Sequence, residues 1–181
     1  MIVEPVGSCS TLVTNEIVKK NSEALDEDLS NLLYVFEELI TAKSDVSSLN
    51  SEQIFRKDLK VVEANNICVA VSSVPQLVKK YLQREDIDVD LQNISESYNY
   101  DIIVLMGIDV SGEVERDLAV VSRRKTLREE LSVYLLEGKD GHLELEVVEI
   151  QFKNINLFNQ KNRTASRKIV LPLIKDWLER K

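Results

Sequence analysis

The chain has 181 residues, of which 44% are hydrophobic and 30% are charged, a balance typical of a globular domain with a sizeable core. It holds 2 cysteines, too few for a disulfide scaffold, and its apolar runs fall far short of the ~20 residues of a membrane-spanning helix. The net charge of −8 does not suit a nucleic-acid polymer or a membrane surface as partner. Since the start of the chain shows no secretory pattern, these features predict a cytoplasmic protein.

The charges are unevenly distributed along the chain. Residues 1–121 hold 22 acidic and 10 basic residues, whereas residues 161–181 hold 7 basic and 2 acidic residues. One interpretation is that solvated cations complement the dipole at the carboxyl end of a final helix, and charge alone favours this interpretation. The alternative is an anion-binding site around Arg167 and Lys168.

Hydrophobic spacing predicts helices in the first third of the chain, before the pattern changes. Apolar residues recur at helical spacing from Leu12 to Val18, within residues 24–42 and, over a shorter span, within residues 49–55. Residues 67–71 then form a short β-branched run, which is typical of a buried strand.

Strands and helices alternate through the rest of the chain. Predicted helices begin at Pro75 and cover residues 89–98, residues 126–136 and the C-terminal segment, with Pro172 in the first turn of that last helix. Predicted strands cover residues 100–107 and 118–121, which form a hairpin around Gly112, and residues 142–152, which hold a bulge or two short strands. Residues 154–164 are expected to be a polar loop. The fold class is therefore α/β, with a mixed sheet flanked by helices.

Two segments in the first third carry groups suited to an anion, and each has a less specific alternative. Gly7 and Ser8 belong to a run of small residues before a helix, where backbone N–H groups approach a ligand closely. An ordinary helix start has the same composition. Arg56, Lys57 and Lys60 lie between a predicted helix and a predicted strand, where they either line a cleft or form a solvated turn.

A third segment precedes the last predicted helix. Arg167 and Lys168 would lie just before its N-terminus, where the helix dipole disfavours cations. A bound phosphate would resolve this conflict, because arginine forks phosphate oxygens and lysine adds a point charge. His142, the single histidine, lies in a turn, and neither cysteine belongs to a Cys-x-x-Cys pair. We therefore assign no metal ligand and no catalytic residue in this chain.

These three segments, taken in order, resemble the DHH phosphoesterase superfamily, in the branch with family II inorganic pyrophosphatases, exopolyphosphatases and prune-type proteins. The matching segments are Val-Glu-Pro-Val-Gly-Ser-Cys-Ser-Thr at 3–11, Arg-Lys-Asp-x-Lys at 56–60, and Ser-Arg-Lys at 166–168 before Leu-Pro-Leu. Residues 43–53 and 97–101 are similar to the prune type in particular, and the resemblance covers nearly the whole chain.

The resemblance implies a division into two parts. Members of the family carry an N-terminal domain, whose Asp-His-His motif helps to bind two divalent metals, and a C-terminal DHH-associated domain that binds substrate phosphates. Residues 1–33 would be a helical remnant of the metal-binding domain, and residues 34–181 the substrate-binding domain. The resemblance assigns phosphate binding to Lys60, Arg167 and Lys168, with Arg56 and Lys57 as neighbours and Gly7 and Ser8 beside the active cleft.

The implied activity is metal-dependent hydrolysis of phosphoanhydride bonds in pyrophosphate or short polyphosphate, with a nucleotide-like phosphodiester as the other substrate class of the family. This chain has no Asp-His-His motif, and Leu33 runs straight into Tyr34 where the family has a further metal-binding segment. An internal deletion, as in a truncated isoform made by splicing, a truncated gene model or a diverged copy, would produce that junction. We therefore expect the Mn²⁺ or Mg²⁺ of the full-length family not to bind strongly here, and the chain to be inactive alone.

Two other interpretations stay open. The missing metal motif and the acidic first two-thirds also fit a non-catalytic module that binds proteins, and the resemblance to prune-type proteins suggests nucleoside diphosphate kinase as one partner. The chain is also interpretable as an unstable fragment, whose first helices would expose an apolar stripe and promote aggregation or dimerisation.

Overall fold

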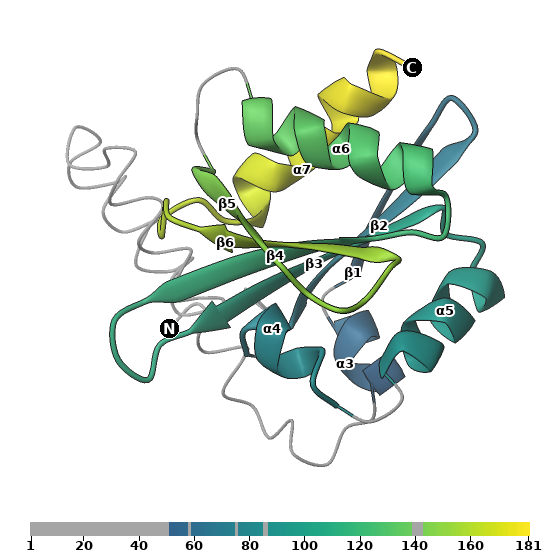
Figure 1. Ribbon diagram of the computed structural model, residues 1–181. Coiled ribbons are helices and arrows are strands. Elements are labelled where there is room, and N and C mark those ends of the chain that lie inside the picture. Colours follow the sequence, from purple (N-terminus) through teal and green to yellow (C-terminus); the bar gives the residue numbers. More distant parts are fainter. Residues whose placement is uncertain (1–50, 58, 75, 85–86, 139–142) are drawn as a thin grey trace, which may run out of the picture.

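The computed structural model describes residues 51–181 apart from 58, 75, 85–86 and 139–142. In this part of the chain, one six-stranded sheet lies between two layers of helices (Figure 1). The helices predicted within residues 12–42, the domain boundary at residue 34, and Gly7 and Ser8 all lie outside the described residues.

The sheet contains parallel and antiparallel neighbours. Its strands are β1 (Leu59–Ala64), β2 (Ile67–Val74), β3 (Ile102–Asp109), β4 (Glu115–Val121), β5 (Leu145–Val148) and β6 (Ile155–Gln160). The helices are α3 (Ser51–Lys57), α4 (Val78–Tyr81), α5 (Ile87–Ser97), α6 (Lys125–Glu137) and α7 (Arg167–Glu179). In the order β1-β2-β3-β4-β6-β5, β2 and β3 are parallel and the other neighbours are antiparallel. The α/β class with a mixed sheet flanked by helices is confirmed.

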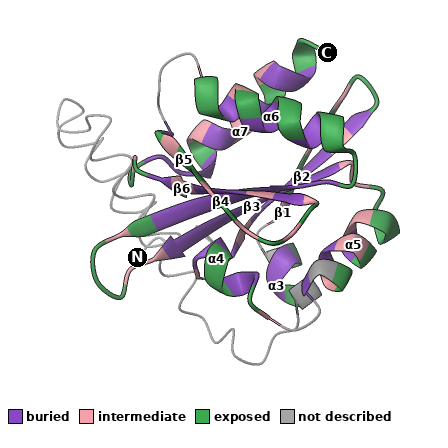
Figure 2. Ribbon diagram, in the orientation of Figure 1, coloured by how far each residue is buried: buried purple, intermediate pink, exposed green. Residues whose placement is uncertain are grey.

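Each face of the sheet has its own hydrophobic core, because successive side chains of a strand point to opposite faces. Val69 and Val71 of β2 pack in the core that includes the apolar faces of α6 and α7. Ala70 and Val74 pack in the core that includes α3, α4 and α5. Figure 2 shows the central strands buried along most of their length, with both helix layers exposed on their outer sides. A charged side chain on a strand is therefore assigned to one layer by its position along the strand.

The predicted elements agree with the structure in the centre and differ at the edges. The strands at 67–71, 100–107 and 118–121, the hairpin at Gly112 and the helices at 89–98 and 126–136 are all present, with shifted ends. The loop expected at 154–164 is wrong, because residues 155–160 form β6 between β4 and β5. The segment 142–152 contributes only β5, and β1 was not predicted.

Two helices begin later or earlier than predicted. The helix expected from Pro75 begins at Val78. The last helix begins at Arg167, so Pro172 lies inside it and not in its first turn. Arg167 and Lys168 are accordingly its first two residues, and they do not precede it.

α4 and α7 begin at the same edge of the sheet, which we call the carboxyl edge because the parallel strands β2 and β3 end there. Asp117, near the start of β4, bonds the first turn of α4. Gln160, the last residue of β6, bonds the carbonyl of Ala165 just before α7. The carboxyl edge therefore carries two helix N-termini, one in each layer of helices.

Candidate functional site

The N-terminus of α7 combines a hydroxyl cap with two cations. Ser166 is the N-cap residue, and its Oγ accepts a hydrogen bond from the backbone N–H of Lys168 at 3.3 Å. No acidic residue lies in the first turn of α7. Arg167 is only 9% exposed, whereas Lys168 is exposed. Because the helix dipole adds partial positive charge here, this end of α7 is suited to binding an anion.

Lys60 lies on the sheet face that α7 covers. It is paired with Val71 across β1 and β2, and Val71 belongs to the core beneath α6 and α7. Directly paired side chains project from the same face of a sheet. Asn65, just beyond the end of β1, donates a 2.8 Å hydrogen bond to the carbonyl of Leu178 and so joins this edge strand to the C-terminal end of α7. Lys60, Arg167 and Lys168 thus belong to one face of the sheet.

Arg56 lies in the other layer. It is on α3, whose Ile54 and Phe55 pack into the core on the opposite sheet face. Its Nη1 donates a 2.8 Å hydrogen bond to the hydroxyl of Tyr98, and its guanidinium lies over the Tyr98 ring. The structure therefore separates Arg56 from the three cations on the α7 face. Lys57 ends α3, and its side chain is outside the described parts.

Two buried polar side chains lie under the start of α7, and sequence reasoning missed both. Arg116 of β4 and Gln160 of β6 are cross-strand partners, each 4% exposed. Arg116 Nε donates to the carbonyl of Arg163 at 2.8 Å, and Gln160 Nε2 donates to the carbonyls of Asn162 and Ala165. The only sequence signal was a charged residue directly before an apolar strand and a Gln within a segment interpreted as a loop.

The loop that leads into α7 also holds itself in place. The Oδ1 atom of Asn162 accepts hydrogen bonds from the backbone N–H of Thr164 at 3.0 Å and of Ala165 at 3.2 Å. With the bonds from Arg116 and Gln160, these contacts anchor the backbone between β6 and Ser166. The fold itself therefore holds the backbone from which Arg167 and Lys168 project.

Two buried oxygens on the same sheet face have no hydrogen-bond partner within the described part of the chain. They are Gln160 Oε1 and Ser73 Oγ. Ser73 pairs with Met106, and Met106 belongs to the core beneath α7. A buried oxygen without a partner costs free energy, so these two atoms leave unused hydrogen-bonding capacity near the candidate site.

The other helix N-terminus at the carboxyl edge is occupied by the protein itself. Asp117 Oδ1 accepts from the backbone N–H of Val78 at 2.7 Å, and Oδ2 accepts from that of Lys79 at 2.9 Å. Burial nevertheless raises the pKa of the Asp117 carboxyl above its ordinary value. Gly107, the strand partner of Asp117, makes room for this contact, because a Cβ there would lie 2.3 Å from Asp117 Oδ1.

Among the residues that the structure describes, no group of three or more His, Cys, Asp or Glu side chains could hold a metal ion. These residues therefore do not fit a divalent metal centre of the type that the resemblance implies. What this part of the chain can do chemically is bind and orient an anion through cations and a helix N-terminus.

Comparison with known proteins identifies the family of this chain, and it is the family that the sequence resembles. The model of the DHHA2 domain matches residues 37–177. The chain therefore belongs to the DHHA2 domain family, as a prune-type member of the DHH phosphoesterase superfamily. It is 29% identical over 218 residues to the exopolyphosphatase PRUNE1 of Mus musculus, a match that spans 97% of this chain and 48% of the relative.

Two further matches also cover most of this chain and less than half of the other protein. The exopolyphosphatase PRUNE1 of Rattus norvegicus is 33% identical over 171 residues, with 93% of this chain and 37% of the relative covered. A candidate family II inorganic pyrophosphatase of Methanococcus jannaschii aligns with a TM-score of 0.49 at 16% identity, covering 93% of this chain and 47% of that one. The chain thus spans about half the length, or less, of these relatives.

The mouse alignment bears on the expected internal gap. Its 218 residues exceed the 181 of this chain, so at least 37 residues of the relative (218 minus 181) face none of its residues. This total does not show whether those residues form one segment, so the internal deletion stays a prediction, as does its position between Leu33 and Tyr34.

Proposed function

We propose that this chain is the phosphate-binding part of a metal-dependent phosphohydrolase that cleaves phosphoanhydride bonds of pyrophosphate or short polyphosphate. The observation that carries the proposal is the start of α7, where Arg167 and Lys168 follow the Ser166 cap on the same sheet face as Lys60. The family and the exopolyphosphatase relatives support the substrate class.

Each group on this face has a separate task. The planar guanidinium of Arg167 suits two oxygens of one phosphate, and its burial limits it to few orientations. Lys168 and Lys60 add point charges from an exposed helix turn and an exposed strand. The positive end of the α7 dipole adds to these charges, although the backbone N–H groups of residues 168–170 already donate to Ser166.

These donors would hold the substrate and offset charge that develops on the phosphoryl oxygens during transfer. A bound Mn²⁺ or Mg²⁺ would supply a metal-activated hydroxide in this chemistry, but the described residues offer no ligand set for it. The proposal therefore assigns binding and charge stabilisation to this chain, and no nucleophile.

The direct test is tripolyphosphate binding by the full 181-residue chain, measured by titration calorimetry. We expect Arg167→Gln to weaken binding about tenfold and Lys60→Ala to weaken it several-fold, as for charge-assisted contacts of about 1–2 kcal/mol. Lys175→Ala, at an exposed position on the same helix, is the matched control and should bind like the parent. Parent-like binding by both site variants would disprove the residue assignment.

Hydrolysis of pyrophosphate and tripolyphosphate, with and without Mn²⁺ or Mg²⁺, separates binding from catalysis. We expect no turnover by the chain alone. Metal-dependent turnover that Arg167→Gln abolishes would instead require a metal centre built with residues outside the described part.

A second proposal is a protein-binding role, with nucleoside diphosphate kinase as one partner. It is supported by the lack of a metal-binding group among the described residues and by an exposed apolar groove. Within those residues no helix is both long and apolar enough to cross a bilayer. The cytoplasmic location expected from the sequence stays part of this proposal.

A further inference from the structure

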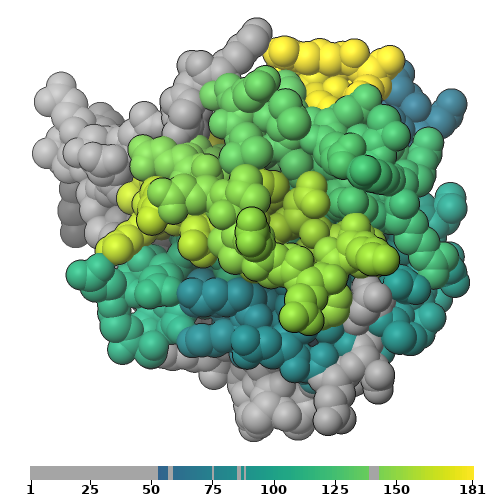
Figure 3. Space-filling model, in the orientation of Figure 1, coloured from purple at the N-terminus to yellow at the C-terminus, as the bar shows by residue number. Residues whose placement is uncertain are grey.

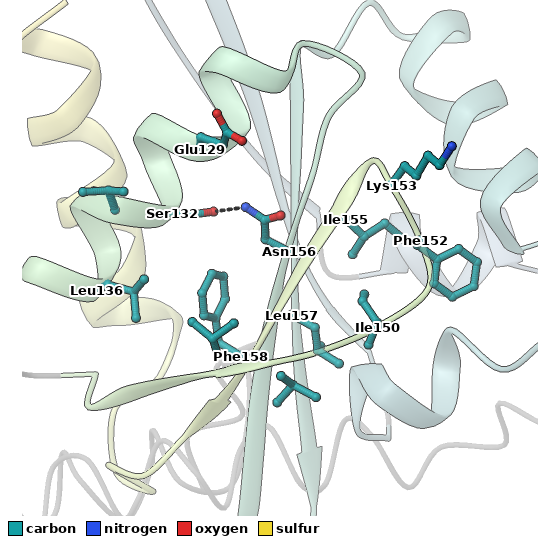
Figure 4. A pocket seen from close by; sticks show the side chains of 13 residues that line it. Glu129, Ser132, Leu136, Ile150, Phe152, Lys153, Ile155, Asn156, Leu157 and Phe158 are labelled. Carbon is teal, nitrogen blue, oxygen red and sulfur yellow. Dashed lines mark hydrogen bonds between the residues drawn. The ribbon is translucent and has the colours of Figure 1, made fainter.

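A groove of about 410 Å³ lies between α6 and the hairpin of β5 and β6. Apolar side chains dominate its lining, among them Val133 and Leu136 from α6, Val147 from β5, and Ile150 and Phe152 from the connection to β6. Figure 4 shows Leu136 and Ser132 on one side of the groove and Ile150 and Phe152 on the other. In Figure 3 the light-green hairpin and the green α6 lie next to each other on the visible face.

Exposed apolar side chains gather at the groove. Over the described part of the chain six large hydrophobic side chains are exposed, and three of them line this groove: Val133 at 48%, Leu136 at 39% and Val147 at 67%. The three come from α6 and β5, which follow each other in the chain. Clustered exposed apolar side chains usually mark a binding surface, whereas single ones need no explanation.

The strand beside the groove is an edge of the sheet. Among the described residues β5 pairs only with β6, so its other side presents backbone N–H and C=O groups without a neighbouring strand. β5 has only four residues, and Glu146 places a charge in its middle. An edge strand beside an apolar groove is the arrangement to which extended peptides add as a further strand.

The two faces of β5 differ in chemistry. Val147 pairs with Phe158, which faces the core beneath α6, so Val147 lies on the groove side. Glu146 pairs with Asn159 and lies on the opposite side. A strand added next to β5 would therefore place alternate residues beside the apolar groove and beside the carboxylate.

The elements that border the groove carry an acidic rim. Glu129 of α6 lines the groove itself, and Glu137, Glu144, Glu146 and Glu149 are exposed carboxylates at the end of α6, on β5 or beside it, with Glu146 on the face of β5 opposite Val147. The cations on the same surface are Lys153, which lines the groove, and Lys161, which pairs with Glu146 at 3.0 Å. A partner whose polar side chains are basic would complement this rim.

We infer that the β5 edge and the α6 groove bind an extended segment of another protein in which apolar and basic residues alternate. The segment adds a strand to β5, its apolar side chains enter the groove beside Val133, Leu136 and Val147, and its Lys or Arg side chains meet the acidic rim. This surface is built from residues other than the phosphate-binding cations of the proposed function.

The probe is a fluorescein-labelled peptide, acetyl-Lys-Val-Lys-Leu-Lys-Val-Lys-amide, titrated with the full chain by fluorescence anisotropy. The control peptide has proline in place of the central leucine, which keeps the charge but removes the strand conformation and a ladder N–H. We expect the control to bind at least about tenfold more weakly. Equal binding of both peptides would overturn the inference, because it would show charge attraction alone.

Variants locate the binding surface. Val147→Asp and Val133→Asp change exposed side chains on two elements and should each weaken the alternating peptide about tenfold. Val89→Asp, at a similarly exposed position on α5, is the matched control and should not. All three should bind tripolyphosphate like the parent, so failure here is distinguishable from failure of the proposed function. If Val147→Asp leaves peptide binding unchanged, the surface is wrong.

The oligomeric state separates a peptide partner from a second copy. We expect light scattering to show the parent and Val147→Asp with the same mass at the concentrations of the titration. A dimer that Val147→Asp dissociates would overturn the inference in favour of self-association through the same face.

Discussion

The two helix N-termini at the carboxyl edge show how similar backbone ends receive opposite chemistry. At α4 the first N–H groups bond to the buried carboxylate of Asp117. At α7 a neutral hydroxyl, Ser166, caps the helix, and the next two residues are cations. The negative charge at α4 comes from within the fold, whereas α7 retains an excess of positive charge. The difference agrees with a structural role for the first helix end and with the proposed phosphate-binding role of the second.

Gly107→Ala should disrupt the contact between Asp117 and the N-terminus of α4, and we expect it to have the largest effect on stability. The added Cβ would lie 2.3 Å from Asp117 Oδ1 and 2.4 Å from the backbone nitrogen of Val78, so strand and helix must separate. We expect a loss of about 3 kcal/mol in the free energy of unfolding, measured with urea. Gly112→Ala has no atom within 4 Å of its new Cβ and should stay within about 0.5 kcal/mol of the parent.

Asp117→Asn tests the charge at the N-terminus of α4. Burial raises the pKa of the Asp117 carboxyl in the folded chain above its value in the unfolded chain. The side chain therefore contributes most to stability at a pH below both pKa values, where it is protonated in the folded and in the unfolded chain. That contribution is lost as the pH rises from the unfolded pKa of about 3.9 through the raised folded value. The free energy of unfolding of the parent minus that of the variant should therefore fall as the pH rises over this window, because Asn does not titrate. A difference that grows with pH in urea titrations would contradict the assignment.

Substitutions of Ser166 test the N-terminus of α7, and we expect them to have the smallest effect on stability. Ser166→Ala removes the cap acceptor for the Lys168 N–H and should cost about 1 kcal/mol of unfolding free energy.

Ser166→Asp keeps a cap acceptor and places a carboxylate at the N-terminus of α7, as Asp117 does at that of α4. We expect its tripolyphosphate affinity to fall about tenfold by charge repulsion at the site. Calorimetry that finds the parent affinity for Ser166→Asp would place the phosphates elsewhere.

Much of the sheet was predictable from the sequence because its central strands are apolar and β-branched on both faces. β1 and β6 escaped prediction for different physical reasons. β1 is an edge strand with Lys60, Val61 and Glu63 exposed, so no clean alternation marks it. β6 carries Asn156 inside the sheet, where its side chain bonds with Ser132 and Arg128. Those partners lie on α6, and no local pattern reveals them.

The residue types that this protein offers to an anion are evident from the sequence: a Ser-Arg-Lys run and a second cationic segment at 56–60. Which of those cations share a face follows from the packing of the folded chain. Lys60 joins α7 because its pairing with Val71 places it on that side, whereas Arg56, four residues earlier, lies on α3 in the opposite layer. Strand side chains alternate with a period of two, so the register of one edge strand selects the members of the site.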